Sequence, residues 1–306
     1  MVNVVSVSGG KDSTALLLLA IERDADPVAV FADTGNEHPI TYAYLDYLQD
    51  ATGVEIRTVK ADFTAQIERK REVVQTKWVK DGVPQEWIDA VLEMLVPSGN
   101  PFLDMCIWKG RFPSAKARFC TEELKILPIT QQVYLPLIAD GHSIMSWQGV
   151  RADESPARAK LPETEEMDLG VIAYRPLLSW NVEQVFAMHG KHGVKPNPLY
   201  KQGMGRVGCM PCINCRKDEL LEISRRFPSE VERIAKWERI VKSVSKGNNA
   251  TFFYNDLADP TAINLDTHGI AGHVEWAKTS RGKTNYDIFR THGEAPICAS
   301  NYGLCE

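Results

Sequence analysis

The sequence contains no long apolar segment. Its longest apolar run extends only from Ala15 to Ile21, whereas a membrane-spanning helix needs about 20 apolar residues. The first residues also lack the basic region, apolar core and cleavage site of a secretory leader. Internal repeats and low-complexity tracts are absent as well. These absences predict a globular, cytoplasmic protein with no membrane partner.

Charge is distributed unevenly along the chain. The 306 residues are 44% hydrophobic and 25% charged, as in ordinary globular proteins. The net charge of −5 argues against a protein whose whole surface binds nucleic acid. Between residues 184 and 217, however, six basic residues and no acidic residue occur. This stretch is either a solvated loop or a site for an anionic substrate or an anionic cluster.

Short apolar strands alternate with helices. Strands are predicted at residues 3–8, 27–33 and 55–59, with helices at 14–23 and 38–52 between them. Later segments that fit the same pattern are strands at 143–150 and 171–176 and helices at 124–138 and 180–189. Such alternation predicts an α/β fold with a parallel sheet that is covered on both faces.

The alternation is interrupted once. Residues 64–95 have a mostly helical pattern, and residues 96–117 are rich in proline, glycine and aromatic residues. We interpret residues 64–117 as a helical insertion in a first domain of residues 1–200. In the second region, residues 201–306, a loop with clustered cysteines precedes an apolar helix stripe from Phe227 to Val244.

The stretch SGGKDS joins the first predicted strand to the first helix. Amide groups at a helix start are unpaired and attract anions, and glycine lets a phosphate approach the backbone closely. Asp12 either helps to hold Mg²⁺ or fixes the loop, and we expect Lys11 and Asp12 on an exposed turn. The alternative is a simple strand-to-helix turn. The spacing differs from GxxxxGK[ST], which excludes the GTPase and kinase type of phosphate loop.

The same motif resembles the pyrophosphate loop of N-type ATP pyrophosphatases. Four further segments are similar, in the same order, to segments of the phosphoadenylyl-sulfate (PAPS) reductase family: VFADTGNEHPITYAYLDYL, RFCTEELKILP, GVRADESPARA and GCMPCINC. Together they cover roughly residues 1–245. The resemblance implies a Rossmann-like, adenine nucleotide α-hydrolase-like fold with an adenine nucleotide over the carboxyl ends of the strands.

The resemblance also assigns nucleotide-binding residues by matching position. They are Ser8, Gly9, Gly10, Lys11, Asp12, Ser13, Asp33, Thr34, Gly149, Arg151 and Arg158. Lys11, Asp12 and Arg151 are the predicted catalytic residues, and ATP and Mg²⁺ are the predicted cofactors. For Arg151 the alternative is a surface ion pair with Asp153 or Glu154.

Three of the seven cysteines are separated by two residues each, a spacing that suggests a metal site in a cytosolic chain. Cys209, Cys212 and Cys215 resemble the run that holds iron–sulfur clusters in ferredoxins. Cys120, which follows RF in the family segment, is the predicted fourth ligand of a [4Fe–4S] cluster. The alternatives are Zn²⁺ bound by the same four thiolates and free thiols without a metal. Cys106 is expected to be a small buried side chain.

The chain departs from the sulfonucleotide reductase pattern at two points. Those enzymes carry adjacent cysteines in the central segment, whereas here Phe119 precedes Cys120, and Cys215 is additional. This pattern is closer to the DNA phosphorothioation members and to cluster-dependent thiolation enzymes. The tail CASNYGLCE carries Cys298 and Cys305, which are a redox pair, sulfur carriers or incidental thiols.

Three functions are compatible with these motifs. In the first, the protein adenylates a substrate with ATP so that sulfur from a donor protein can replace oxygen. In the second, it reduces adenylyl sulfate or PAPS by thiol chemistry. The intact loop favours the first, because a sulfonucleotide reductase releases no pyrophosphate. The third is a nucleotide-binding, metal-stabilised partner without catalysis, inside a nucleic-acid modification complex.

The stretch CIWKGRFPSAKARFC combines basic and aromatic residues. Its four basic residues have no acidic residue between them and are Lys109, Arg111, Lys116 and Arg118. One interpretation is that this stretch touches a nucleic-acid substrate and that Trp108 and Phe112 stack on its bases. The alternatives are phosphate contacts to the nucleotide and a solvated loop.

Overall fold

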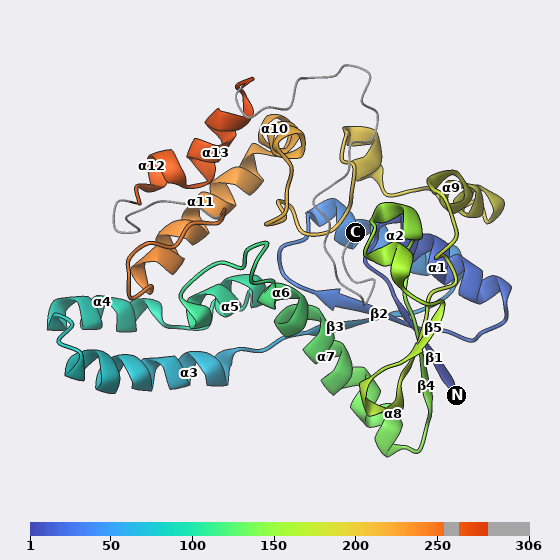
Figure 1. Ribbon diagram of the computed structural model, residues 1–306, viewed down its shortest axis with the longest axis horizontal. Helices are drawn as coiled ribbons and strands as arrows, with labels where there is room; N and C mark the ends of the chain where they lie inside the picture. Colours follow the sequence, from blue (N-terminus) through green and yellow to red (C-terminus); the bar gives the residue numbers. More distant parts are fainter. Residues whose placement is uncertain (254–262, 281–306) are drawn as a thin grey trace. The chain divides into compact units, whose positions relative to one another are not determined.

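The computed structural model describes residues 1–253 and 263–280, which group into two compact units (Figure 1). Unit 1 comprises residues 1–60 and 121–214. Unit 2 comprises residues 61–120 together with 215–253 and 263–280. The predicted insertion therefore belongs to the same unit as the residues that follow the clustered cysteines. Cys298 and Cys305 lie outside the described residues.

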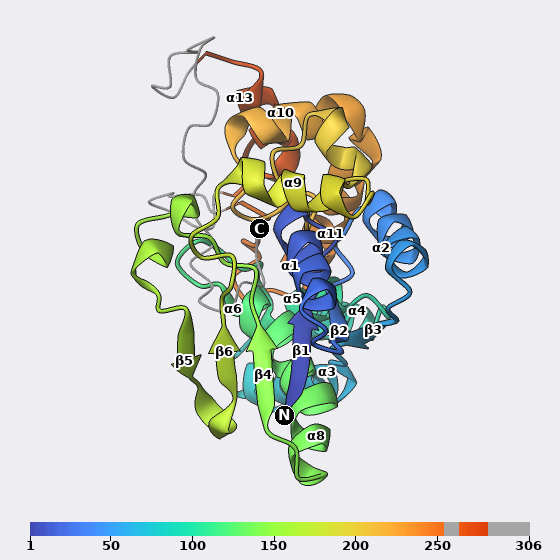
Figure 2. The same cartoon turned by 90° about the vertical axis from the view of Figure 1, so that its right-hand side faces the viewer.

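Unit 1 is built on a six-stranded sheet with the order β3-β2-β1-β4-β6-β5 (Figure 2). The strands are β1 (Val2–Ser6), β2 (Val28–Asp33), β3 (Ile56–Lys60), β4 (Ile144–Trp147), β5 (Thr164–Glu166) and β6 (Ile172–Tyr174). Neighbouring strands are parallel except for β5 and β6. The predicted α/β fold with a parallel sheet is confirmed. β5 was not predicted, because its three side chains are exposed and show no apolar alternation.

Helices cover both faces of this sheet. They are α1 (Lys11–Glu22), α2 (Pro39–Thr52), α9 (Val182–Lys191) and a helical run through α7 (Leu127–Ile129) and α8 (Leu135–Ala139), with π-helical turns at Glu122–Ile126 and Thr130–Tyr134. The short helix α6 (Phe119–Thr121) precedes this run, where the chain passes from unit 2 to unit 1. Short 3₁₀ turns lie at Ala152–Glu154, Arg158–Lys160, Asp168–Gly170 and Pro198–Gln202. Because successive strand side chains alternate between faces, Val5 packs in the core on one side and Val4 in the core on the other.

The strand order reverses between β1 and β4. β1 pairs with β2 on one side and with β4 on the other, so the chain segments that follow β1 and β4 meet at one edge of the sheet. In open α/β sheets, ligands bind at such a switch point, outside the carboxyl ends of the strands. The SGGKDS loop follows β1 directly, and Gly149 and Arg151 follow β4. The topology therefore brings the predicted site residues of both segments to one place.

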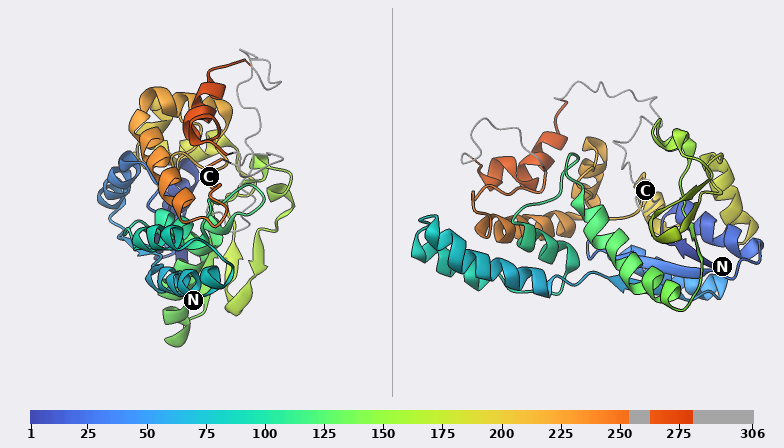
Figure 3. Two further views of the ribbon diagram at one scale, coloured as in Figure 1. Left: turned by 90° about the vertical axis from the view of Figure 1, so that its left-hand side faces the viewer. Right: turned by 60° about the horizontal axis from the view of Figure 1, so that its bottom comes forward.

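Unit 2 is helical (Figure 3). Its helices are α3 (Thr64–Val73), α4 (Gln85–Met94), α5 (Pro101–Lys109), α10 (Lys217–Arg226), α11 (Pro228–Ser243), α12 (Leu265–His268) and α13 (Ile270–Ala277), with a π-helical turn at Val74–Trp78. α3 and α4 lie side by side, and Arg71 donates hydrogen bonds to carbonyl groups at the end of α4. Of the helices that the structure describes, none combines the length and apolarity that crossing a membrane requires.

The core of unit 2 joins the insertion to the later helices. Phe102 of α5 is almost fully buried and stacks on Trp237 of α11, with 5.6 Å between ring centroids. Phe112 is also buried and meets Phe252 edge to face at 5.5 Å. The expectation that Phe112 stacks on nucleic-acid bases is therefore wrong, because its ring belongs to this aromatic core.

Lys70 ties two helix ends of unit 2 together. Its ammonium group donates to the carbonyl groups of Ile107, in the last turn of α5, and Val244, just after α11, at 2.7 and 3.1 Å. Burial lowers the pKa of Lys70 to about 8. A cation is favourable at a helix carboxyl end, where the last carbonyl groups carry partial negative charge. Lys70 therefore supports the packing of unit 2.

Candidate functional site

The SGGKDS loop wraps around one hydroxyl group. The Oγ of Ser13 accepts a hydrogen bond from the Ser8 N–H at 3.1 Å, lies 3.0 Å from the Ser8 Oγ, and donates to the Gly10 carbonyl at 3.2 Å. Gly9 has a φ of 79°, a left-handed conformation that side chains disfavour. α1 then begins at Lys11, so the loop ends at a helix amino terminus that favours anions.

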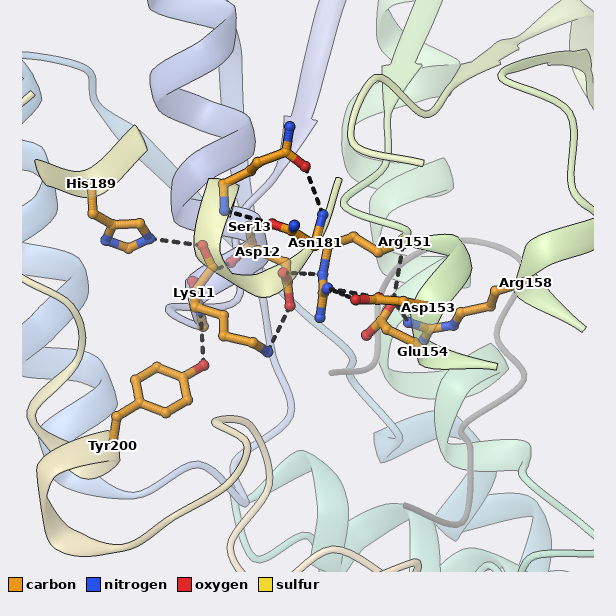
Figure 4. A network of polar contacts seen from close by, with 12 residues as sticks. Lys11, Asp12, Ser13, Arg151, Asp153, Glu154, Arg158, Asn181, His189 and Tyr200 are labelled. Atoms are coloured by element: carbon orange, nitrogen blue, oxygen red, sulfur yellow. Dashed lines mark hydrogen bonds and ion pairs between the residues drawn. The ribbon is translucent and has the colours of Figure 1, made fainter. Parts of the chain in front are cut away.

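Asp12 forms a buried ion pair with Arg151 (Figure 4). The Asp12 side chain is 0% exposed, and its carboxylate lies 2.6 Å from the Arg151 Nε and 2.8 Å from the Lys11 Nζ. Arg151 also pairs with Asp153 at 2.6 Å. Burial alone would lower the pKa of Arg151, but the carboxylates of Asp12, Glu154 and Asp153 outweigh it and raise that pKa. Arg151 is therefore charged throughout the physiological range.

This pair corrects one expectation. Asp12 does not lie on an exposed turn, because Lys11 and Arg151 enclose its carboxylate. The Lys11 side chain is not exposed either, because only 12% of it is accessible. Of the two roles predicted for Asp12, the geometry directly supports fixing the loop. Arg151 does pair with Asp153, as the alternative prediction has it, but its guanidinium is buried and holds the loop as well.

The segment after β4 packs closely on the loop. A Cβ atom on Gly149 would lie only 3.4 Å from the carbonyl carbon of Asp12, so glycine allows the two backbones to approach. Glu154 accepts a hydrogen bond from the Arg151 N–H at 3.0 Å and pairs with Arg158, which is also buried. Arg158 thus supports the segment that positions Arg151.

Three residues that sequence reasoning missed hold the loop from another side. Tyr200 accepts a hydrogen bond from the Lys11 N–H at 2.8 Å, and Asn197 donates to the Gly9 carbonyl at 3.1 Å. His189 contacts the Lys11 carbonyl through Nε2 at 2.8 Å. Burial lowers the pKa of His189, which favours a neutral ring that donates through Nε2. All three lie in the stretch 184–217, which contains no acidic residue. This stretch was identified from its charged residues alone, so these three neutral side chains were overlooked.

Asp33 and Thr34 at the end of β2 are engaged in local structure. Asp33 accepts hydrogen bonds from the Gly35 N–H at 2.8 Å and the Tyr42 hydroxyl at 2.7 Å, and it pairs with Lys60 at 3.0 Å. The Thr34 hydroxyl donates to buried Glu37 at 2.7 Å. These contacts fix the β2 end beside the loop.

The end of β2 also contacts the loop of unit 1 that carries Cys209 and Cys212, which we call the cysteine loop. The Met210 N–H donates to the Asn36 carbonyl at 2.8 Å, and the Asn36 side chain donates to the Pro211 carbonyl at 3.0 Å. The Cys209 Sγ lies 3.5 Å from the Thr34 Oγ1. The segment after β2, which carries the predicted nucleotide-binding residue Thr34, is therefore in direct contact with the cysteine loop.

The four predicted metal ligands are divided between the units. Cys209 and Cys212 belong to unit 1, and Cys120 and Cys215 belong to unit 2. All are free thiols, and the Cys212 Sγ accepts the Asn214 N–H at 3.5 Å, a type of contact that also tunes iron–sulfur clusters. Within the described residues, no three His, Cys, Asp or Glu side chains gather as a metal site. The donor set suits a soft metal, and the four-ligand site stays a prediction.

Cys106 is fully buried in α5, which confirms its expected packing role. Burial raises the pKa of its thiol, and the nearby Cys120 acts in the same direction. A buried thiol with a raised pKa is a poor nucleophile.

A cavity of about 230 Å³ opens in unit 1 near the carboxyl ends of β1 and β4. It is lined by apolar side chains such as Ile126 and Met167 and by polar groups such as Ser146 and Gln148. Ser6, the last residue of β1, also lines it. Ser6 precedes Ser8, the first residue of the SGGKDS loop, by two residues.

The fold and this loop define an α/β protein with a glycine-containing loop, ending at a helix amino terminus, at the switch point of a mostly parallel sheet. A family model, the phosphoadenosine phosphosulfate reductase domain, matches residues 2–215, and the chain belongs to this family. An uncharacterised 37.8 kDa protein from the gpa 5' region of Escherichia phage 186 is 48% identical over an alignment of 325 positions. The alignment covers 100% of this chain and 97% of that protein.

Two further relatives carry functional names. Adenosine 5'-phosphosulfate reductase of Rhizobium meliloti is 30% identical over 131 residues, 42% of this chain and 43% of that enzyme. The match therefore spans less than half of the reductase. A crystal structure of PAPS reductase from Candida auris in a phosphate complex covers 69% of this chain and 82% of its own, with 20% identity and a TM-score of 0.43.

Replacement of Asp12 is expected to destabilise unit 1. Asp12→Ala leaves Arg151 buried without its main partner, and breaking such a pair costs about 3–5 kcal/mol. The matched control is Asp153→Ala, which removes the half-exposed partner of the same guanidinium and should cost about 0–1 kcal/mol. Urea unfolding monitored by fluorescence measures both. Equal small losses would show that the Asp12 contact does not support the fold.

Replacement of Tyr200 is expected to tighten the binding of inorganic pyrophosphate. The Tyr200 hydroxyl occupies the Lys11 N–H, which an anion on the loop would also use. Tyr200→Phe removes a competitor worth about 1 kcal/mol, which corresponds to roughly fivefold in affinity. Tyr47→Phe is the control, since its hydroxyl accepts the Lys195 N–H away from the loop. Isothermal titration gives the affinities, and weaker binding by Tyr200→Phe would contradict competition.

Proposed function

We propose that the protein binds ATP with Mg²⁺ and adenylates a substrate so that sulfur can replace oxygen. The observation that carries this proposal is the intact SGGKDS loop at the switch point, with Gly9 in a left-handed conformation and Lys11 at the start of α1. A loop of this kind suits a departing pyrophosphate, which carries several negative charges. A reductase of adenylyl sulfate releases no pyrophosphate and has no need of it.

The proposed chemistry has two displacements. A substrate oxygen attacks the α-phosphorus of ATP, the bond from that phosphorus to the bridging oxygen breaks, and pyrophosphate leaves with both bonding electrons. A sulfide-level sulfur nucleophile then attacks the activated carbon and displaces AMP. Neither step changes the number of electrons held by enzyme and substrate, so no external oxidant is consumed.

Each site residue has a role in this scheme. Lys11 and the amide groups at the start of α1 stabilise the negative charge that develops on pyrophosphate. Arg151 and Asp12 keep the loop in its binding geometry. Gly149 has no side chain, so the segment after β4 can approach the backbone of Asp12 closely. The cavity of about 230 Å³ beside Ser6 is the proposed place of the adenine ring. Its mixed apolar and polar lining suits a planar heterocycle with hydrogen-bonding edges.

The cysteines are the proposed ligands of a [4Fe–4S] cluster, with Zn²⁺ as the alternative. Cys120, Cys209, Cys212 and Cys215 would hold it, and each iron would then carry a protein ligand. If Cys120 were not a ligand, one iron would stay open and could hold a sulfur atom. The contacts of Asn36 with the cysteine loop would place two of these ligands beside the end of β2.

Reduction of adenylyl sulfate or PAPS is the second candidate. It is favoured by one observation, the sequence match to an adenosine 5'-phosphosulfate reductase. In that case the loop would contact a nucleotide without releasing pyrophosphate. A nucleotide-binding partner without turnover is the third candidate, inside a nucleic-acid modification complex.

Nucleotide preference separates the first two candidates. ATP with Mg²⁺ at a hundredfold excess over its dissociation constant should stabilise the protein by about 2.7 kcal/mol, and pyrophosphate should be released when a sulfur acceptor is present. Lys11→Met should lose both effects. The control Lys191→Met removes a lysine of unit 1 that pairs with Glu22 at the surface and should retain both. Stabilisation by adenylyl sulfate or PAPS but not by ATP would replace the proposal with the reductase function.

Metal content tests the cysteine assignment separately. Anaerobically purified protein should contain iron and sulfide and absorb in the visible range, and Ser at any of the four positions should sharply reduce both contents. Cys106→Ala is the control, because this buried cysteine is not a proposed ligand. A colourless protein with one zinc would contradict the cluster. Full cluster content in Cys120→Ser would show that only three cysteines are ligands.

A further inference from the structure

Positive charge is concentrated in unit 2. In its described residues, unit 2 has 19 lysine and arginine side chains against 16 aspartate and glutamate side chains, whereas unit 1 has 13 against 19. The excess in unit 2 includes residues 105–120, where four basic residues and no acidic residue occur. The overall negative charge of the chain therefore conceals a locally basic segment.

Aromatic rings hold two of these cations in place. The Lys109 Nζ lies 3.8 Å from the centroid of the Trp108 ring and 5.6 Å from that of Phe119, and the Arg111 guanidinium lies 5.5 Å from Phe119. The other neighbour of Trp108 is Phe63, which stacks on it at 5.6 Å. Such cation–π contacts restrict the long side chains before any ligand binds. The cost of ordering them on binding is correspondingly smaller.

A tight backbone turn presents the other two cations. Ser114 and Ala117 exchange N–H to carbonyl hydrogen bonds at 3.1 and 3.0 Å, which places exposed Lys116 at the turn. The Arg118 Nε donates to the Ala115 carbonyl at 3.0 Å. Arg111 and Arg118 thus contact a ring and a carbonyl group in these interactions, not a carboxylate. We call residues 108–119 the basic hairpin.

We propose that the basic hairpin binds the phosphate backbone of single-stranded nucleic acid. Several cations in one short segment match a polyanion with regularly repeated charge, and the arginine fork matches phosphate oxygens. Trp108 and Phe119 are only partly buried. Their accessible parts offer apolar contact to bases, which are exposed in a single strand and enclosed by stacking in a duplex. This partner is additional to the ATP site and does not depend on its chemistry.

The salt dependence of binding tests this surface in the full chain. The probe is a fluorescein-labelled oligodeoxythymidine of 20 nucleotides, measured by anisotropy over a series of salt concentrations. Each phosphate contact contributes about −0.7 to the slope of log K against log salt for a single strand. Arg111→Ala combined with Lys116→Ala removes two exposed cations, so the slope should become shallower by about 1.4. The binding of ATP should remain unchanged in this double variant.

The matched control removes two arginines elsewhere in unit 2. Arg225→Ala with Arg226→Ala has the same change in net charge, and both arginines pair with Glu222 on α10. This variant should keep the wild-type slope. If the slope became shallower by the same amount in both double variants, net charge alone would explain the effect, and the proposal would be overturned. It would also be overturned by tighter binding of a duplex of the same length, or by displacement of the oligonucleotide by polyglutamate at equal charge.

Discussion

The ion pair between Asp12 and Arg151 is the contact on which the site depends. It joins the segment after β1 to the segment after β4, the two central strands whose order reverses at this point of the sheet. Both side chains are almost completely buried, so neither charge is stable there without the other. The loop keeps its shape only while Arg151 is held by its own segment. Gly149, Asp153 and Glu154 provide that support.

A second set of contacts reaches the loop from residues 189–200, and it consists of neutral groups. Tyr200, Asn197 and His189 bind the backbone of Gly9 and Lys11 and leave the Lys11 ammonium group to Asp12. The same stretch of chain continues to Cys209, which contacts the end of β2. An anion that changes the contacts of Tyr200 would therefore act on a segment that also carries a cysteine. The loop, the β2 end and the cysteine pair form one connected part of unit 1.

Sequence patterns predicted the sheet and the site loop well. The strands near 3–8 and 27–33 were found because buried parallel strands form nearly continuous apolar runs, whereas in the strand near 55–59 only Ile56 and Val59 are buried. α5 was missed because Pro101 and Gly110 suggested a loop, although here the proline occupies the first turn and the glycine ends the helix in a left-handed conformation. α10 was missed because its residues are mostly charged, and only its spacing of Leu220, Leu221 and Ile223 marks the buried face.

Long-range contacts account for the remaining differences between the sequence-based predictions and the structure. The burial of Asp12 requires Arg151, which lies 139 residues away in sequence, and nothing local to SGGKDS indicates it. Phe112 was expected at a nucleic-acid surface because its neighbours are basic, yet Phe252 covers it. In both cases a distant residue decides whether a side chain is exposed. Local composition is a poor guide to that property.

The chain order of the two units has a consequence for synthesis on the ribosome. Within the described residues, the two units alternate along the chain, so no contiguous fragment contains one unit whole and nothing of the other. Phe102 emerges well before Trp237, the ring on which it stacks. During elongation its apolar face is therefore without its native cover, and the nascent insertion is a candidate for chaperone binding until the last helices of unit 2 arrive.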